Sequence, residues 1–570
     1  MLKTIVMLLL CLPALVQAQQ FPDPGYPQNY FAKPVHIPIL LAGNYGELRP
    51  GHFHEGLDIK TRGVIGYRVY AAADGYISRV AISHTGFGHV IYITHPNGYT
   101  TVYGHLHAFN PKLAAYVKRQ QYKGESWKID LALAPELFPV QKGEYIALSG
   151  ATGSVAGPHV HFEIRNTKSE HPLNGQRFGF DITDHIAPSV YRIALYDRNR
   201  SIYEQSPEIL SLHASGDHYS PSGGTLTVST DRVGFGVQTI DRQNGTHNTY
   251  GIYEAVLYAD DQAQCGFRLD DIGYEETRYV DAHYDYKTYM QTRRHFELFF
   301  DLPGNRLPIY TDFAGNGTVD LSDGKTHAIK MVVKDAAGNA SVIRFNLRRD
   351  PAAAKAAAPS CTQPMYPDTR NIFENDQVQF YLEPGTLYDS ICFQYKEIPD
   401  NTAGHYSSTF RLHYDYVPLY TGFVLRIKPN RPIADSLKGR LVLVCKDTKG
   451  HTEGVTPATL KDGWVQASVR SFGDYTVEVD TDPPTVRPLN IREGADLSGA
   501  KDIRFTIGDG KSGVYTYRAE LDGKWLMFAR KRSTIFYTFD SHCPPGAHRL
   551  QLTVTDGAGN QTIKVYHFKR

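Results

Sequence analysis

GPHVHFEI, residues 157–164, is the stretch that decides the fold of the first part of the chain. Its polar and apolar residues alternate, and this period of two predicts a β-strand with one buried face. The polar face carries His159, His161 and Glu163. Two histidines side by side on a strand can divide labour, because one can bind a metal ion while its neighbour reaches the metal-bound water.

A second motif, GHFHEGLDI at 51–59, offers an imidazole and a carboxylate around a glycine-containing turn. His54 and Asp58 can close on one cation, and zinc accepts nitrogen and oxygen donors of this kind. The spacing alone is a weak signal. Position 58 is aspartate, so the helical zinc-peptidase motif H-E-x-x-H is absent.

A third motif, TTVYGHLH at 100–107, places Tyr103, His105 and His107 on one face of a second predicted strand. The period of two does not choose between His105 and His107 as the functional residue.

These three motifs, together with VYAAADGYI at 69–77, resemble the lysostaphin/LytM-type zinc endopeptidases, which cut peptide bonds in bacterial cell walls. The match includes an H-x-G-x-D-type motif, in which Glu55 and Gly56 precede Leu57. All four segments agree with that family in order and separation over residues 40–166. The resemblance implies a β-sheet peptidase domain with the duplicated hybrid motif fold.

The same resemblance implies a role for each candidate residue. His54, Asp58 and His161 are expected to bind Zn²⁺. His105 and His159 are expected to be the unliganded catalytic histidines, which selects between the two histidines left open above. Three protein ligands leave a fourth zinc position for water, as in catalytic zinc sites.

The division of work between the two catalytic histidines stays open. One of His105 and His159 is expected to act as general base, and the other to stabilise the oxyanion and assist proton transfer to the leaving amine. Glu163 has two interpretations: it orients a ligand histidine, or it is a solvated carboxylate on a strand.

An insertion at residues 110–138 distinguishes this sequence from compact members of the family. Leu113, Tyr116 and Val117 have helical spacing and predict a helix over 112–120. The insertion can line the substrate groove, act as a lid or pack elsewhere, and the sequence does not choose among these roles.

The remaining two-thirds of the chain predict strands joined by tight turns. DAAGN (335–339) and DGAGN (556–560) each lie between two alternating runs, a hairpin pattern in which Asp, Gly and Asn accept positive φ. APSV (187–190) and DPPTV (482–486) recur at the matching starts. These features resemble the Ig-like β-sandwich modules of bacterial extracellular proteins, so we expect a mainly β protein with two or three such modules after the peptidase domain.

A chain of 570 residues is too long for one hydrophobic core. The predicted organisation is a signal peptide (1–18), a zinc peptidase domain (19–186, core 40–166), a β-sandwich domain (187–349), a linker rich in alanine and proline (350–359), a β-sandwich-like domain (360–480) and a C-terminal Ig-like domain (481–570).

The N-terminus predicts export. Lys3 precedes an apolar stretch at 5–16, and small residues at Val16 and Ala18 mark a cleavage site. The apolar run is short for a membrane span, and no later segment is predicted to cross a membrane. We therefore expect a soluble, exported mature chain in the periplasm, the cell envelope or outside the cell.

Five cysteines follow the signal at wide, irregular spacing, which supports neither a cysteine zinc site nor a disulfide framework. One bridge among Cys361, Cys392 and Cys445 and a set of buried free cysteines are equally favoured.

A net charge of +1 gives no reason to expect nucleic acid as a partner. The leading hypothesis is an endopeptidase that hydrolyses peptide cross-links of peptidoglycan and therefore binds its peptide stems. The alternatives are a non-catalytic regulator or scaffold of other cell-wall hydrolases and a general extracellular metalloprotease. The β-sandwich modules are candidates to bind other envelope proteins.

Overall fold

The computed structural model describes residues 21–353 and 360–570. The predicted signal peptide (1–18) and residues 354–359 of the predicted linker lie outside the described residues. The predicted mainly β fold is confirmed, because strands dominate the described chain and its helices are few. Within these ranges, no helix has the length and apolar character needed to cross a lipid bilayer.

One nine-stranded sheet carries all three histidine-containing motifs. Its central strand, β13, lies antiparallel between β4 and β8. The register places His161 opposite Asp58 on β4 and opposite Gly104 on β8. Hydrogen bonding between strands thus joins residues that are 57 and 103 positions apart in sequence.

The strands of this sheet, in chain order, are β1 (Leu41–Gly43), β4 (Leu57–Lys60), β6 (Gly75–Ile82), β7 (His89–Thr94), β8 (Tyr99–Gly104), β10 (Ile129–Ala132), β11 (Pro139–Val140), β13 (His159–Asn166) and β14 (Pro172–Leu173). Two smaller sheets accompany it, formed by β2 (Leu48–Arg49) with β3 (His52–Phe53) and by β5 (Arg68–Tyr70), β9 (Ala108–Phe109) and β12 (Tyr145–Leu148).

The insertion forms α1 (Pro111–Lys123), which is longer at both ends than the predicted helix. The Asn110 side chain accepts a hydrogen bond from the backbone N–H of Leu113 at 2.9 Å and caps the helix, while Pro111 supplies a suitable first residue. Leu113 and Val117 are buried against the first region of the chain.

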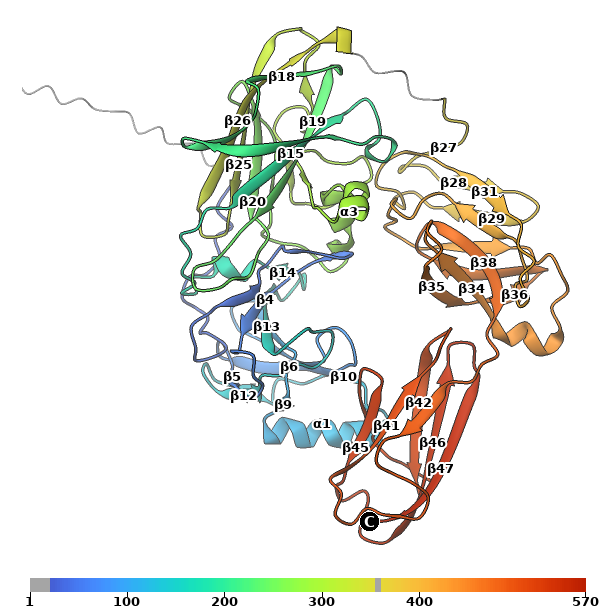
Figure 1. Ribbon diagram of the computed structural model, residues 1–570. Helices are drawn as coiled ribbons and strands as arrows, with labels where there is room; N and C mark the ends of the chain where they lie inside the picture. The colour runs from blue at the N-terminus through green and yellow to red at the C-terminus, as the bar shows by residue number, and fades with distance from the viewer. Residues whose placement is uncertain (1–20, 354–359) are drawn as a thin grey trace, which may run out of the picture.

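The opposite side of α1 contacts the C-terminal region of the chain. Lys118 forms an ion pair with Asp540, and the ring of Tyr122 stacks on that of His542 with centroids 3.6 Å apart. Figure 1 shows the result: the chain runs through four regions and returns to α1, so that the molecule forms a closed ring. Of the three roles considered for the insertion, packing against another part of the protein is the one these contacts display.

The second region is built on a twelve-stranded sheet. Its strands are β15 (Ser189–Asp197), β16 (Glu208–Ser215), β17 (His218–Pro221), β18 (Thr225–Val228), β19 (Arg232–Ile240), β20 (Glu254–Ala259), β21 (Gln262–Arg268), β22 (Glu297–Leu298), β23 (Tyr310–Asp312), β24 (Val319–Asp320), β25 (Thr326–Lys334) and β26 (Ala340–Arg349), with short helices α2 (Val280–His283) and α3 (Tyr286–Thr292).

This region packs directly on the first. The Tyr250 hydroxyl donates to the Leu41 carbonyl at 2.8 Å, and the Asn44 side-chain amide donates to the Gly251 carbonyl at 2.9 Å. Buried apolar side chains from Phe31 to Val477 form one continuous cluster. The first three regions therefore share a core rather than hanging from flexible joints.

The third region has two five-stranded sheets. One contains β28 (Asn371–Glu374), β29 (Val378–Leu382), β33 (Phe423–Ile427), β36 (Thr459–Lys461) and β37 (Trp464–Val469); the other contains β31 (Tyr395–Ile398), β32 (Thr409–Leu412), β34 (Leu441–Lys446), β35 (Thr452–Pro457) and β38 (Gly473–Val479). A short ladder joins β27 (Pro364–Met365) to β30 (Ile391–Cys392).

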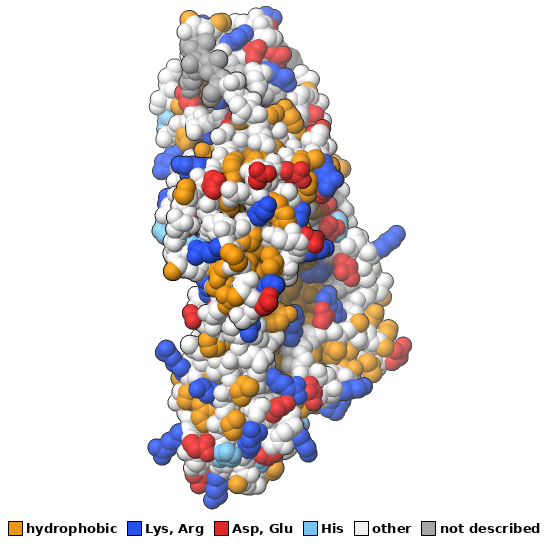
Figure 2. All heavy atoms as spheres, turned by 90° about the vertical axis from the view of Figure 1, so that its right-hand side faces the viewer, with side chains coloured by type: hydrophobic (Ala, Val, Ile, Leu, Met, Phe, Trp, Pro, Cys, Tyr) orange, Lys and Arg blue, Asp and Glu red, His pale blue; other side chains and the backbone are white. Residues whose placement is uncertain are grey.

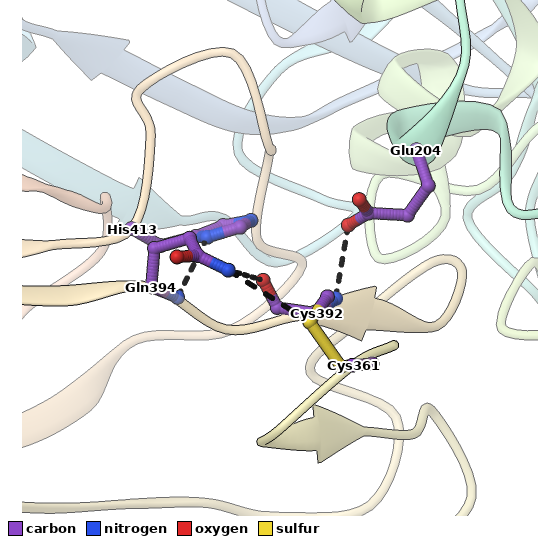
Figure 3. The surroundings of a disulfide bond; sticks show 5 residues. All are labelled: Glu204, Cys361, Cys392, Gln394 and His413. Atoms are coloured by element: carbon purple, nitrogen blue, oxygen red, sulfur yellow. Dashed lines mark hydrogen bonds between the residues drawn. A yellow bond between two sulfur atoms is a disulfide. The ribbon is translucent and has the colours of Figure 1, made fainter. Parts of the chain in front are cut away.

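A disulfide between Cys361 and Cys392 ties the start of this region to β30 (Figure 3). The backbone N–H of Cys392 also donates to Glu204 of the second region at 2.9 Å. Cys445, the third candidate for a bridge, is buried and free. The bridge therefore fastens the chain at the point where it enters the third region.

The C-terminal region has a core of its own, formed by residues from Val486 to Phe568. Its sheets contain β39 (Thr485–Pro488), β41 (Asp502–Gly508), β44 (Ala529–Lys531) and β45 (Thr534–Thr538) on one side, and β40 (Ala495–Asp496), β42 (Val514–Leu521), β43 (Lys524–Trp525), β46 (Ala547–Asp556) and β47 (Gln561–Lys569) on the other.

Both predicted hairpins are confirmed. DAAGN joins β25 to β26, and DGAGN joins β46 to β47. On the side of the ring that holds the third and C-terminal regions, Figure 2 shows basic and acidic side chains interspersed, with apolar groups between them.

Candidate metal centre

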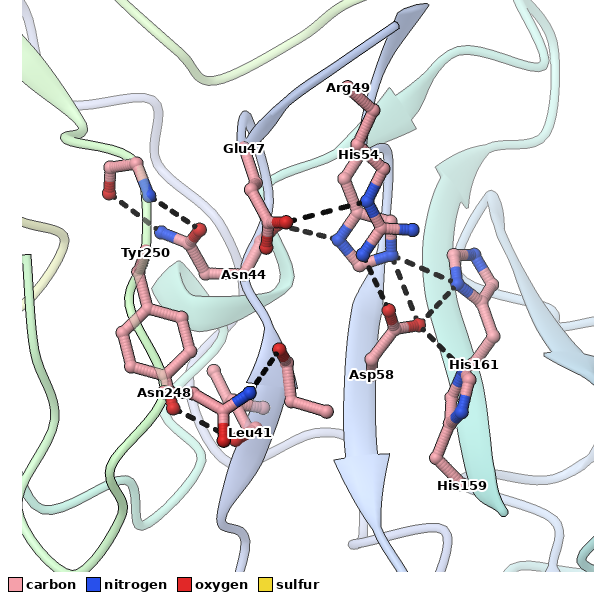
Figure 4. A network of polar contacts seen from close by, with 12 residues as sticks. Leu41, Asn44, Glu47, Arg49, His54, Asp58, His159, His161, Asn248 and Tyr250 are labelled. Carbon is pink, nitrogen blue, oxygen red and sulfur yellow. Dashed lines mark hydrogen bonds and ion pairs between the residues drawn. The ribbon is translucent and has the colours of Figure 1, made fainter. Parts of the chain in front are cut away.

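The five side chains selected from the sequence come together at the end of the central strands of the nine-stranded sheet. Asp58 lies on β4, His159 and His161 lie on β13, and His54 lies in the turn before β4 (Figure 4). His105 follows β8 and adopts a φ of 59°, a left-handed conformation that is uncommon for a residue with a Cβ.

Three donor atoms converge. His54 Nε2 lies 3.1 Å from Asp58 Oδ1 and 3.1 Å from His161 Nδ1, and His161 Nδ1 lies 2.9 Å from Asp58 Oδ1. A tetrahedral zinc site with bonds of about 2.0 Å has donor–donor edges of about 3.3 Å. The separations and the two-nitrogen, one-oxygen donor set are therefore compatible with a small metal ion such as zinc.

The glycine of the first motif has a packing reason. A Cβ on Gly56 would lie 2.6 Å from Nε2 of the His161 ring. That ring is buried and held by hydrogen bonds to Asp58 and Glu163, so moving it away would break both contacts. Only glycine at position 56 lets the imidazole reach its place beside Asp58.

Each candidate ligand also contacts a neighbouring group through an atom that is not one of the three donor atoms. His54 Nδ1 lies 2.7 Å from the Asn44 carbonyl, and His161 Nε2 lies 2.8 Å from Glu163 Oε1. Arg49 Nη2 donates at 2.7 Å to Asp58 Oδ2, the carboxylate oxygen that does not face the histidines. Such contacts fix the ring tautomer and the carboxylate orientation of a metal site.

Glu163 is a buried positioning residue, with 1% of its surface exposed. Its Oε2 accepts a hydrogen bond from Arg165 Nε at 2.6 Å, and its Oε1 accepts one from the Tyr274 hydroxyl at 2.6 Å. Burial raises the pKa of Glu163, but Arg165 and His161 outweigh this effect and lower the pKa to about 2. Of the two interpretations given above, the solvated strand carboxylate is wrong.

Tyr274 belongs to the second region, between β21 and α2, and it completes this network from outside the first region. Its hydroxyl also accepts a hydrogen bond from Arg165 Nη2 at 3.1 Å, and its ring lies under the Arg165 guanidinium, 4.7 Å from its centroid. The alternation of β13 continues to position 165, so Arg165 was detectable in the sequence. Tyr274 carries no comparable signal.

The remaining two histidines lie beside the donor triad. His159 Nε2 is 3.2 Å from Asp58 Oδ1, is buried and has no correctly directed hydrogen-bond partner among the described residues. The His105 ring lies 4.8 Å from that of His159, and its Nδ1 is 2.9 Å from the Thr152 carbonyl. His107 is exposed. The structure therefore brings His105, rather than His107, to the centre.

Burial and mutual repulsion control the charge of these rings. Burial lowers the pKa of His54 to about 4, and burial together with His161 and His159 lowers that of His105 to about 3. Burial also opposes protonation of His161, but its hydrogen bonds to Asp58 and Glu163 outweigh this and raise its pKa to about 9. The carboxylates thus favour a positive charge at the centre.

Comparisons with known proteins place this region among peptidases. Residues 52–138 match peptidase family M23, a span that includes His54, Asp58 and His105 but ends before β13. Residues 362–480 match the Zu5-like domain.

Similar curated proteins include an uncharacterized metalloprotease of Haemophilus influenzae, 35% identical over 129 residues, 22% of this chain and 21% of that protein. The cell division protein DipM of Caulobacter vibrioides is 31% identical over 24% of this chain and 18% of its own length. The peptidoglycan DD-endopeptidase ShyB of Vibrio cholerae is 34% identical over 20% of each chain. The chain thus spans about a fifth of the length of these relatives.

Similar solved structures include the catalytic domain of the antimicrobial peptidase lysostaphin from Staphylococcus simulans, which is 24% identical with a TM-score of 0.17 over 22% of this chain and 80% of that one. The catalytic domain of the M23 protein EnpA from Enterococcus faecalis is 23% identical with a TM-score of 0.17 over 23% and 85%. From the sequence match over residues 52–138 and the relatives aligned with the first part of the chain, we conclude that this protein contains a peptidase family M23 domain.

Proposed function

We propose that this protein is a zinc metalloendopeptidase that hydrolyses the peptide cross-links of bacterial peptidoglycan. The observation that carries the proposal is the convergence of His54, Asp58 and His161 within 3.1 Å, with the buried imidazole of His105 and the half-buried imidazole of His159 beside them. The peptidoglycan endopeptidase names of relatives such as ShyB support the substrate class.

His54 Nε2, Asp58 Oδ1 and His161 Nδ1 would hold the metal in this proposal. Three protein ligands leave a fourth position open. A zinc ion bound there supplies Lewis acidity, which polarises a peptide carbonyl and lowers the pKa of a water molecule. Asn44, Arg49 and Glu163 keep the three donors oriented from behind.

His159 and His105 would move the protons. Neither side chain is needed as a ligand. His159 Nε2 lies 3.2 Å from Asp58 Oδ1 without a well-directed hydrogen bond among the described residues, so it could take a proton from the attacking water. The other imidazole stabilises the oxyanion and assists the departing amine. Both rings have Nδ1 2.9 Å from a backbone carbonyl, that of Gly157 for His159 and that of Thr152 for His105, so either histidine can serve as the base.

Complete candidate ligation favours an enzyme over a scaffold. A non-catalytic regulator of cell-wall hydrolases needs neither a full set of ligands nor a buried Glu163–Arg165–Tyr274 network behind them. A general metalloprotease would have the same centre but a different substrate, so a direct assay is needed to separate the two.

The test is digestion of purified sacculi by the zinc-loaded chain, with products identified by mass spectrometry. We expect muropeptides whose cross-link peptide bond has been hydrolysed, released by the wild type but not by a variant lacking His161. Cleavage of an unstructured protein such as casein without release of muropeptides would favour the general protease. No cleavage of either substrate would favour the scaffold.

The proposal places the mature chain in the cell envelope, the periplasm or outside the cell, where peptidoglycan is found. Export through the predicted signal peptide is part of the same proposal. The β-sandwich regions are then available as spacers or as surfaces for other envelope proteins.

The Tyr274→Phe variant tests whether the second region supports the metal. Loss of the hydroxyl removes one hydrogen bond from Glu163 and weakens the orientation of His161, so we expect zinc affinity to fall about tenfold. Competition with a chromophoric chelator measures this change. Tyr515→Phe, at a side chain that is 77% exposed, is the matched control. Equal zinc affinity in the two variants would remove Tyr274 from the site.

A further inference from the structure

Two clusters of aspartates lie away from the histidine centre, at the starts of two of the β-sandwich regions. The first contains Asp184, Asp241 and Asp335, and a carboxylate oxygen of each lies within 4.8 Å of the other two. Asp184 lies in the segment between β14 and β15, Asp241 directly follows β19, and Asp335 opens the β25–β26 hairpin turn. Three separate segments thus contribute one carboxylate each.

The second cluster repeats this plan at the last region. It contains Asp480, Asp509 and Asp556, again with carboxylate oxygens within 4.8 Å of one another. Asp480 lies in the segment before β39, Asp509 directly follows β41, and Asp556 ends β46 at its hairpin turn. In both clusters, the three aspartates come from the same places in the fold: the segment that enters the region, the end of a strand and a D-x-A-G-N turn.

The two turns have the same internal geometry. In the first, Asp335 Oδ1 accepts from the backbone N–H of Asn339 at 2.9 Å, and Oδ2 accepts from its side-chain amide at 2.7 Å. In the second, Asp556 accepts from the same two groups of Asn560, both at 2.8 Å. These bonds aim each aspartate in a fixed direction and leave room for further acceptor contacts on both carboxylate oxygens.

The asparagines also connect each turn to the entering segment. Asn339 Nδ2 donates to the Asp184 carbonyl at 3.4 Å, and Asn560 Nδ2 donates to the Asp480 carbonyl at 3.0 Å. In both cases the entering aspartate stands four residues before a proline, Pro188 or Pro484, that precedes the first strand. The repeated motifs noted in the sequence therefore meet in space.

The first cluster contains a buried acceptor with no partner. Asp241 is 4% exposed, and its Oδ1 makes no hydrogen bond in the described structure. Burying a carboxylate without compensation is unfavourable, and gathering three makes it more so. Across both clusters, none of the six aspartates has an ion pair with lysine, arginine or histidine within the described residues. No basic side chain of the described residues therefore neutralises these carboxylates in an ion pair.

We propose that each cluster is a binding site for one calcium ion, which joins the entering segment of a β-sandwich to a strand end and a hairpin turn of the same region. All the donors are oxygens, with no imidazole or thiol in either group, and this set suits a hard divalent cation rather than zinc. Three carboxylates, backbone carbonyls and water can complete the six to eight ligands of Ca²⁺. The sites are separate from the histidine centre.

The consequence is ion-dependent anchoring of two junctions. Asp184 lies between the M23 domain and the second region, and Asp480 lies between the third and last regions. A calcium ion at each site would fix the direction in which the next sandwich leaves the preceding one. Metal binding would then fix the orientation of neighbouring regions at two junctions of the ring in Figure 1.

The experiment is titration of the metal-stripped full-length chain with calcium chloride, followed by isothermal calorimetry. We expect two ions per chain, each with a dissociation constant on the order of 10⁻⁴ M, as in extracellular modules. Asp241→Asn should remove one ion, Asp509→Asn the other, and the double variant both. Asp261→Asn, at a side chain that is 92% exposed, is the control and should retain both.

Asparagine has the size of aspartate, so these variants are expected to fold, and circular dichroism checks this. A folding defect in a variant leaves the wild-type result decisive: no saturable binding up to about 10 mM calcium overturns the proposal. Two ions retained by Asp241→Asn or by Asp509→Asn also overturn the assignment. His161→Ala should keep both ions, which separates these sites from the peptidase centre.

Discussion

Replacing His161 with alanine should release the zinc ion and reduce the hydrolysis of sacculi to the level of a blank. His161 Nδ1 is one of three converging donors, and two ligands do not hold zinc as three do. The substitution also leaves Glu163 and Asp58 as buried carboxylates without their shared histidine. Metal analysis of the purified chain measures the first effect, and release of soluble muropeptides measures the second.

His107→Ala is the matched control, because His107 follows the same strand as His105 but is exposed. It should keep stoichiometric zinc and full activity. A His161→Ala chain that is folded, as judged by circular dichroism, and still cleaves at the wild-type rate would rule out a metal mechanism built on this residue.

Replacing His159 with alanine should give the opposite combination: zinc retained and hydrolysis lost. His159 approaches the donor triad, but its Nε2 is not among the three atoms that converge. General acid–base catalysis contributes about 10²–10⁴-fold to rate, so we expect kcat to fall by a factor in that range. His105→Ala should fall in the same class. Zinc content and turnover of a soluble cross-linked muropeptide, measured on the same preparation, check both expectations.

The pair also distinguishes the two roles. Removing the histidine that acts as base should abolish the acidic limb of the pH–rate profile. Removing the histidine that stabilises the oxyanion should instead lower the rate across the whole profile. Loss of zinc from either variant would move that histidine into the ligand set and contradict the assignment made above.

The candidate metal centre was largely predictable because its residues lie on short, regular segments. On β13 a period of two fixes which side chains share a face, and the H-x-x-x-D spacing places His54 and Asp58 around one turn. The choice between His105 and His107 was not available from periodicity, since both occupy the same face of an extended strand. The left-handed φ of His105 is what breaks that pattern.

The support behind the centre was predictable only in part. Glu163 and Arg165 follow from the alternation of β13, but their burial does not, because a strand face is solvated or covered according to what packs on it. Tyr274 provides that cover from a position 111 residues beyond Glu163. Contacts of this kind depend on how two regions dock, and no local pattern encodes docking.

The same limit applies to the insertion. The spacing of Leu113, Tyr116 and Val117 predicted the helix, while the cap at Asn110 and the proline after it extended its start. Its contact with the last region joins residues 422 positions apart in the case of Lys118 and Asp540. The predicted boundaries between the β-rich regions remain predictions, although hairpin turns marked two of those regions correctly.

Closure of the ring has a consequence for how the molecule moves. The contact at α1 rests on Lys118 with Asp540, Glu125 with Arg518 and the stacking of Tyr122 on His542, and partly exposed ion pairs contribute only about 0–1 kcal/mol each. The rest of the chain holds α1 and the last region at high effective concentration, so the contact between them forms readily. Under tension or at high salt, we expect this contact to open before the others. When this contact opens, we expect the last region, which has a core of its own, to turn about its junction with the third region, because the first three regions share one core.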